Sequence, residues 1–322
     1  MLTLHRILSP IDFSEPSKRA LRHALAIARW HESEVTVLHV EDVLLHAASV
    51  SAGGYPELAK RHDQELHDFI NGAGGSGRNV RVHIASGDAV SRILEHATRE
   101  ASDLIVMGTN GRSGLARAVL GSVTERVVRQ STIPILTIPP SAESRDSDEL
   151  IPFDPILCAS DFSPACRKAL DLAILMGQEA DARLILLHAL QLPHLDSGIM
   201  PMPLPVSARI EFSEFRKDAL ARLKRGLPAD ALFRCRPEPV VTEGRPADMI
   251  LQTASTEDVK LIVMGVQARG ALDRLIFGST TRRVMQAATC PVLSIRAGQA
   301  AEAWPAWPGV APQTLVAATS ES

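Results

Sequence analysis

Two short glycine-containing segments have the residue types and spacing to bind a charged ligand. Residues 108–114 (GTNGRSG) follow an apolar run, and residues 121–123 (GSV) begin a helical pattern. Glycine permits positive φ angles and close approach of the backbone to a ligand, and the first amides of a helix form an anion site. Asp12 follows an earlier apolar run. These residues predict a pocket for a polyphosphate, with a carboxylate opposite it.

The same residues also fit purely structural roles. Asp12 could simply form an Asx turn that leads into a helix capped at Ser14, and glycines after a strand often only make turns. Ser122 and Ser279 could be helix N-caps as well as ligands. Arg112 could bind phosphate or be an ordinary surface charge, and the sequence leaves both alternatives open.

The chain repeats itself once, which places these residues in a wider pattern. Residues 7–14 recur 149 residues later and residues 104–108 recur 157 residues later, so the second repeat is eight residues longer. The recurring segments are residues 7–14 (ILSPIDFS) and 156–163 (ILCASDFS), 104–108 and 261–265 (both LIVMG), 121–124 (GSVT) and 278–281 (GSTT), and 133–136 (IPIL) and 290–293 (CPVL).

Each repeat alternates short apolar runs with amphipathic stretches. Ser14 and Ser163 stand where helix N-caps belong, and Pro164 is at a first helical position. Alternating strands and helices predict an α/β fold with a parallel sheet covered on both faces, and ligands of such sheets bind at the carboxyl ends of the strands. The apolar runs of the first repeat lie at about residues 4–10, 34–40, 79–85, 103–107 and 134–138.

The complete pattern resembles the universal stress proteins, whose nucleotide-binding members carry G-x2-G-x9-G-[ST]. Here Gly108, Gly111, Gly121 and Ser122 match it without departure. The resemblance covers both repeats and implies two tandem, doubly wound, five-stranded parallel-sheet domains of Rossmann-like type with strand order 3-2-1-4-5. It also implies an intramolecular pseudo-dimer in which the last strands of the two domains pair, residues 135–138 with residues 292–295.

The resemblance implies that the first repeat binds ATP, with or without Mg²⁺. Asp12 follows the first strand and Val40 follows the second, positions that the family uses around adenine and ribose. The residues expected at the nucleotide are Pro10, Asp12, Val40, Met107, Gly108, Gly111, Arg112, Gly121, Ser122 and Val123.

The second repeat departs from the motif, because Ala268 replaces the middle glycine. If this position needs a left-handed backbone, alanine costs on the order of 1 kcal/mol or more, and its methyl group would stand where phosphate approaches. Nucleotide binding there is expected to be weaker or absent. The corresponding residues are Asp161, Met264, Gly265, Gly278, Ser279 and Thr280, with Ala159, Ala189 and Thr280 replacing Pro10, Val40 and Val123.

The amino-acid composition argues for some classes of protein and against others. The chain is 45% apolar and 22% charged, which is typical of a soluble globular protein. A net charge of -3 and 4% aromatic residues argue against nucleic acid as a partner. No export signal or membrane-length apolar run is found, so we expect a cytoplasmic protein. The four cysteines form no C-x-x-C pair and are expected to be free and mostly buried.

The predicted domains are residues 1–140 and 154–297, joined by a polar linker at 141–153 and followed by a tail at 298–322. Three functions are consistent with this domain organisation. The first is an ATP-binding stress or regulatory protein with a protein partner, without catalytic residues or a metal site and with at most slow hydrolysis. The second is a scaffold that binds no nucleotide, alone or as a further homodimer. The third, an ATP-using enzyme, rests on fold analogy alone.

Overall fold

The computed structural model describes residues 4–41, 55–75, 79–110, 120–142, 153–178, 181–191, 206–266 and 278–296. The predicted tail, most of the predicted linker and the middle of both glycine-rich loops lie outside these residues. No helix in the described part of the chain has the length and apolarity that crossing a membrane requires.

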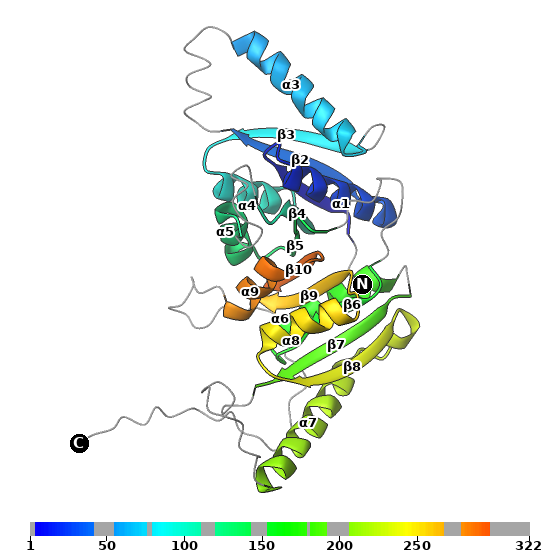
Figure 1. Cartoon of the computed structure of the whole chain (residues 1–322). Coiled ribbons are helices and arrows are strands. Elements are labelled where there is room, and N and C mark those ends of the chain that lie inside the picture. Colours follow the sequence, from blue (N-terminus) through cyan, green and yellow to red (C-terminus); the bar gives the residue numbers. More distant parts are fainter. Residues whose placement is uncertain are drawn as a thin grey trace, which may run out of the picture.

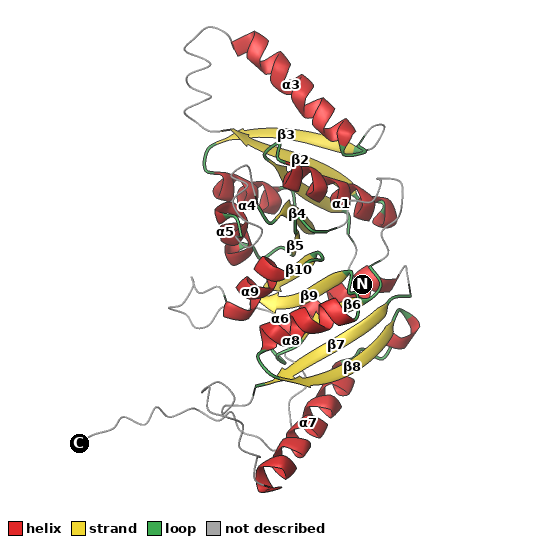
Figure 2. Cartoon of the chain, viewed as in Figure 1, coloured by secondary structure: helices red, strands yellow, loops and turns green. Residues whose placement is uncertain are grey.

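Each repeat folds into five strands and the helices that connect them (Figure 2). The first repeat contains β1 (Arg6–Ile11), α1 (Glu15–His31), β2 (Glu34–Glu41), α3 (Tyr55–Gly72), β3 (Val80–Ser86), α4 (Ala89–Arg99), β4 (Leu104–Gly108), α5 (Ser122–Gln130) and β5 (Ile135–Ile138). The second contains β6 (Ile156–Ala159), α6 (Pro164–Gly177), β7 (Arg183–Leu190), α7 (Val206–Gly226), a 3-10 turn (Ala231–Phe233), β8 (Arg236–Glu243), α8 (Pro246–Thr256), β9 (Leu261–Val266), α9 (Ser279–Ala287) and β10 (Val292–Arg296).

All ten strands form one sheet, in the order β3-β2-β1-β4-β5-β10-β9-β6-β7-β8. The predicted order 3-2-1-4-5 is therefore confirmed in each repeat. Neighbouring strands within each repeat are parallel. Figure 1 shows the repeats end to end, with β5 and β10 meeting in the middle.

The continuous sheet has one hydrophobic core on each face, and both cores include residues of the two repeats. Apolar residues of α1, α3, α6 and α7 pack on one face, whereas those of α4, α5, α8 and α9 pack on the other. The central strand β4 is buried along its whole length, as expected for a parallel sheet covered on both faces.

Local sequence signals explain where the helices begin. Ser14 caps α1 by accepting a hydrogen bond from the Ser17 amide, and Ser163 caps α6 by accepting one from the Cys166 amide. Pro164 is the first residue of α6, where proline's fixed φ suits a helix and its missing N–H costs nothing. Both predicted caps are confirmed.

The repeats meet where β5 pairs antiparallel with β10, which confirms the predicted pairing. Leu136 faces Leu293 at the centre of the register. On either side, the Thr137 hydroxyl donates to the Val292 carbonyl at 3.1 Å, and the Ser294 hydroxyl donates to the Ile135 carbonyl at 3.3 Å. Since Thr137 and Ser294 are equivalent positions of the repeats, these buried bonds are related by the pseudo-two-fold axis.

The described ends of the predicted linker are packed into the molecule. Ala142 is 5% exposed and Phe153 is 1% exposed, and both belong to the core that contains α1 and α6. The Phe153 ring lies edge-on to Trp30, with 6.4 Å between ring centroids. The Ser141 hydroxyl donates to the Thr289 carbonyl. These contacts add side-chain packing to the strand pairing between the repeats.

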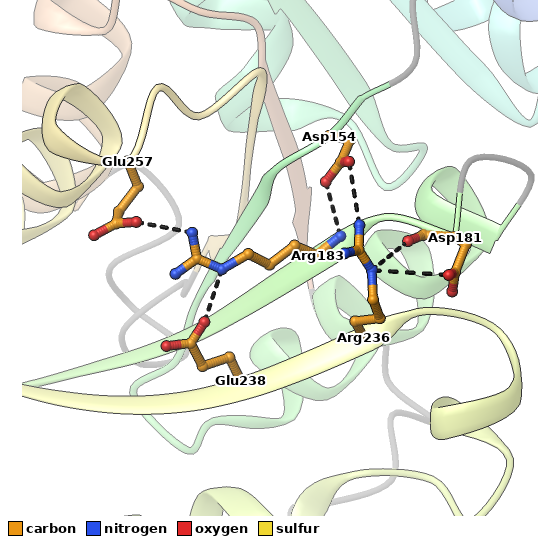
Figure 3. A network of polar contacts seen from close by, with 6 residues as sticks. All are labelled: Asp154, Asp181, Arg183, Arg236, Glu238 and Glu257. Carbon is orange, nitrogen blue, oxygen red and sulfur yellow. Dashed lines mark hydrogen bonds and ion pairs between the residues drawn. The ribbon is translucent and has the colours of Figure 1, made fainter.

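A network of ion pairs lies at the amino ends of the strands β6, β7 and β8 in the second repeat (Figure 3). Arg183 bonds Glu238 and Glu257, each at 2.8 Å, while Arg236 bonds Asp154 at 3.3 Å and the Asp181 carbonyl at 2.8 Å. The network links the starts of β6, β7 and β8 to the end of α8. The side chains are partly exposed, so each pair contributes only about 0–1 kcal/mol.

We expect the hydroxyl bonds between β5 and β10 to stabilise the joined sheet. Thr137→Val or Ser294→Ala removes one donor from a buried carbonyl and should each lower the free energy of unfolding by roughly 1 kcal/mol. Thr98→Val is the control, because the Thr98 hydroxyl also donates to a carbonyl, that of Leu94, but on an exposed helix face. Chemical denaturation measures all three. An equal effect of the control and the central substitutions would contradict this role.

Candidate functional site

The structure gathers the described residues of the predicted site at the carboxyl ends of neighbouring strands. Pro10 is near the end of β1, Val40 near the end of β2, and Gly108 is the last residue of β4. Strand β1 lies between β2 and β4. Gly111 and Arg112 lie outside the described residues, as does Ala268 in the second repeat.

Three apolar residues of the predicted site share one face of the sheet. Met107 is 5% exposed and belongs to the core under α4 and α5, and the partly buried Val40 and Val123 pack against the same core. Pro10 is also buried. A ligand at these strand ends would therefore meet an apolar wall on the α4 and α5 face, while its polar contacts come from the adjoining loops.

Asp12 makes the Asx turn that its position allows. Its Oδ1 accepts hydrogen bonds from the Ser14 amide, at 3.1 Å, and from the Ser14 hydroxyl, at 2.5 Å. The turn places Phe13 at φ 62°, a left-handed conformation that costs a non-glycine residue roughly 1–2 kcal/mol. The structural role considered for Asp12 is therefore present, and one carboxylate oxygen already has two donors.

The second repeat builds the same turn with a different neighbour. Oδ1 of Asp161 accepts from the Ser163 amide at 3.0 Å and from the Cys166 thiol at 2.8 Å, and Phe162 has φ 63°. Cys166 occupies the position of Ser17 in the first repeat. Burial, followed by the Asp161 carboxylate, raises the pKa of the Cys166 thiol to about 12. All four cysteines are free and buried, which confirms the prediction for them.

Sequence reasoning missed a phenylalanine–histidine pair beside each of these turns. The Phe13 and His39 ring centroids are 4.7 Å apart, and those of Phe162 and His188 are 4.4 Å apart. Nδ1 of His39 contacts the Ile11 carbonyl at 3.1 Å, and His188 makes the equivalent contact in the second repeat. Both the phenylalanine and the histidine recur 149 residues later, and this shared offset is the sequence signal that could have revealed the pairs. These pairs hold the strained turns against β2 and β7.

Packing by itself favours glycine at the end of β4 and requires it within β9. A Cβ atom on Gly108 would lie 3.0 Å from the carbonyl carbon and oxygen of Pro16, at the start of α1. On Gly265 it would lie 2.6 Å from Ala165 C and Cys166 N. These glycines let the first turn of α1 and of α6 approach the sheet, whether or not a ligand is present.

The amide donors at the start of α5 differ from the sequence expectation. Gly121 is the N-cap, so Ser122 is the first helical residue and not a cap. The Gly121 amide donates to the Thr109 carbonyl at 2.7 Å, which removes it from the set of amides expected to be available. The amides of Ser122 and Val123 have no hydrogen-bond partner among the described residues, because the first amides of a helix lack intrahelical acceptors.

Thr124 anchors this helix and was not predicted as a site residue. Its buried hydroxyl donates to the Gly108 carbonyl at 2.8 Å, which ties the start of α5 to the end of β4. The second repeat keeps the arrangement: Gly278 caps α9, Ser279 is the first helical residue, and Thr281 is 4% exposed. The threonine shared by GSVT and GSTT was the signal. The cap role left open for Ser122 and Ser279 is therefore taken by Gly121 and Gly278.

No metal centre is found in the described ranges. They contain no group of three or more histidine, cysteine, aspartate or glutamate side chains that could hold a metal ion. What the geometry offers is two backbone donors without a partner in the described part of the chain, at the positive end of a helix dipole and beside a buried apolar wall. This arrangement suits an anionic group attached to an apolar moiety.

Comparison with known proteins agrees with the fold. The sequence profile described as the universal stress protein family matches residues 3–139 and again residues 152–296. A universal stress protein of Methanocaldococcus jannaschii is 35% identical over 137 residues, 41% of this chain and 81% of that protein. One from Mycolicibacterium smegmatis is 26% identical over 304 residues, 91% of this chain and 98% of that protein.

A solved structure extends the likeness to the tandem arrangement. A universal stress protein from Archaeoglobus fulgidus covers 91% of this chain and 98% of its own, with a TM-score of 0.63 and 22% sequence identity. At this identity the likeness shows the fold, which is shared across both repeats.

We expect alanine to be tolerated less well at Gly265 than at Gly108, because its Cβ would come closer to backbone atoms. Overpacking of this kind costs about 1–3 kcal/mol, and unfolding of Gly108→Ala and Gly265→Ala measures it. Gly278→Ser is the control: the nearest atom to its Cβ is Thr281 Oγ1 at 3.8 Å, and serine is a good N-cap. Destabilisation by the control as large as by Gly265→Ala would contradict this packing argument.

The raised pKa of Cys166 predicts a thiol that does not react with thiol reagents in the folded protein. Only the thiolate reacts with Ellman's reagent, so at mildly alkaline pH the folded protein should release almost no thionitrobenzoate, whereas denaturant should expose all 4 cysteines. Cys166→Ser carries the residue of the first repeat and should behave identically when folded. A fast-reacting thiol that disappears in Cys166→Ser would show the pKa argument to be wrong.

Proposed function

Because this chain belongs to the universal stress protein family, we propose that it is a regulatory protein that binds ATP mainly in its first repeat. The observation that carries the proposal is the pair of amides on Ser122 and Val123, which have no partner among the described residues. They lie at the start of α5, which the Thr124 hydroxyl ties to the end of β4.

The chemistry of the surrounding residues supports a nucleotide over a simple anion. Met107, Val40 and Val123 contribute to one apolar cluster, which suits the face of a base, while the helix start suits phosphate. Each unpaired amide could make a charge-assisted hydrogen bond with a phosphate oxygen. Gly111 and Arg112, which lie outside the described residues, are proposed as further phosphate contacts from the matching motif.

The second repeat is proposed to bind nucleotide weakly or not at all. Ala189 occupies the position of Val40, and Ala159 that of Pro10, so the apolar wall loses side-chain area. The polar hydroxyl of Thr280 replaces a methyl group of Val123. These changes accompany Ala268 in the loop, and together they favour asymmetric occupancy of the tandem.

We further propose that ATP is held and not turned over at a useful rate. Asp12 is the one carboxylate among the predicted site residues of the first repeat, and its Oδ1 already accepts two hydrogen bonds from Ser14. ATP that binds only the folded state would stabilise the chain by linkage. A nucleotide-dependent stability of this kind would let cytoplasmic ATP control the binding of a protein partner.

One observation favours the alternative of a scaffold without nucleotide. The glycines at 108 and 265 are both explained by packing against a helix start, and the Gly121 amide is already bonded to Thr109. Part of the motif therefore has a structural reason that needs no ligand. The two functions differ in a measurable property, the affinity of the folded chain for ATP.

Proline substitution tests the amide donors directly. Gly121 has φ −61° and ψ 142°, a conformation that suits the residue before proline, and proline is favoured at the first helical position. Ser122→Pro should therefore keep α5 while it removes one amide. Loss of a hydrogen bond to a charged group should weaken ATP binding by roughly tenfold or more, as measured by isothermal titration calorimetry.

Four further variants complete the titration. Ser122→Ala removes only the hydroxyl and should bind more tightly than Ser122→Pro, while Ser279→Pro in the second repeat should leave the main affinity unchanged. Gly111→Ala should abolish binding, and Ala268→Gly tests whether the second loop regains a site. If wild type binds no ATP, the scaffold replaces this proposal. Equal affinities of Ser122→Pro and wild type would exclude the amide as a ligand.

A further inference from the structure

A cavity outside the nucleotide site lies between the edge strand β3 and helix α4. It has a volume of about 220 Å³ and is lined by His83, Ala85, Ser86, Arg92, Glu95, His96 and Arg99. This is smaller than the roughly 300–1,000 Å³ of pockets for organic ligands. Its polar lining has several hydrogen-bond donors but only one carboxylate.

His96 gives the cavity a buried donor without an acceptor. The residue is 5% exposed, and its Nε2 has no hydrogen-bond partner among the described residues. Nδ1 of His96 lies 2.9 Å from Nη2 of Arg99. Because a guanidinium can only donate, Nδ1 accepts and the ring proton is on Nε2. A buried N–H group without a partner is unfavourable unless a ligand supplies an acceptor.

The neighbouring groups add donors, and each arginine of the lining has one carboxylate partner. The His83 ring stacks on His96 with centroids 4.6 Å apart. Glu95, the only carboxylate in the lining, is paired with Arg92 at 2.8 Å, and Glu100, next to the lining, is paired with Arg99 at 3.1 Å. Arg92 also donates through Nε to the Ser86 carbonyl at 2.9 Å. A ligand that enters this cavity must therefore bring its own acceptors.

The cavity's histidines and arginines have no histidine or arginine counterparts in the second repeat. The strand registers make Val240 the counterpart of His83, because Leu38 faces His83 and the equivalent Leu187 faces Val240. Helices α4 and α8 both have 11 residues, so Met249 and Thr253 correspond to Arg92 and His96. A Cβ on Gly87 would lie 3.0 Å from Arg92, and one on Gly244 would lie 3.2 Å from Met249, which confirms this equivalence. The shared backbone does not require these charged side chains.

We propose that this cavity binds a small oxyanion with the charge and size of inorganic phosphate, held by His96 Nε2, His83 and the guanidinium groups of Arg92 and Arg99. The oxyanion supplies the acceptor that His96 lacks, and it shares the guanidinium donors of Arg92 and Arg99 with their partners Glu95 and Glu100. Ala85 pairs with Val40 in the sheet, so the site adjoins the predicted nucleotide site without sharing its helix start.

Calorimetric titration with inorganic phosphate tests the site, using residues that the second repeat already accommodates. His96→Thr and Arg92→Met should each weaken phosphate binding roughly tenfold or more, since each removes a donor to an anion. Arg81→Gln is the charge-matched control, because Arg81 is also on β3 but does not line the cavity and should leave the affinity unchanged. Circular dichroism checks that every variant folds.

Two further measurements separate this site from the nucleotide site. Phosphate should shift the NMR signals of the His96 ring, which are assigned by their absence in His96→Thr, and should still do so in Ser122→Pro. ATP affinity should be unchanged in Arg92→Met. The proposal is overturned if phosphate does not bind, if His96→Thr and Arg92→Met bind it as wild type does, or if Ser122→Pro alone removes the binding.

Discussion

The antiparallel pairing of β5 with β10 joins two five-stranded sheets into one and thereby fixes the faces and ends of the whole molecule. It leaves only β3 and β8 as edge strands, and it lets each hydrophobic core run across both repeats. Because strands of the two repeats run in opposite directions, their carboxyl ends point in opposite directions. The two candidate nucleotide sites therefore lie apart, on opposite ends of the strands, and cannot share a ligand.

Within this common frame, side chains have diverged where the backbone has not. The pair between Glu34 and Arg81 in the first repeat is reversed to Arg183 and Glu238 in the second. Ser17 is replaced by Cys166 next to the same Asx turn. Partly exposed ion pairs such as these can be exchanged at little cost in stability, whereas the turns and helix starts are held by backbone geometry. Asymmetric function is therefore compatible with a symmetric fold.

In the candidate site, residues of one motif have a packing role as well as a proposed ligand-binding role. Where a helix start presses against the sheet, packing favours Gly108 and requires Gly265, and the Thr124 hydroxyl binds the carbonyl of the glycine that ends β4. The same construction leaves the next helix amides facing out of the strand ends. Tight packing at the topological switch point thus puts the first amides of α5 at the strand ends, which is where ligands of such sheets bind.

The sequence by itself determined the repeat, the strands and the caps at Ser14 and Ser163, because hydrophobic period and local turn chemistry are properties of neighbouring residues. The strand order and the pairing of the two halves were implied by the resemblance to the universal stress proteins. The site at the carboxyl ends of the strands stays a prediction, the cap role of Ser122 was left open, and the Gly121 amide was counted as available. Only the tertiary structure decided the last two points, as well as the meeting of His83 with His96. Each depends on contacts between distant segments, such as Gly121 with Thr109, and such contacts leave no local pattern in the chain.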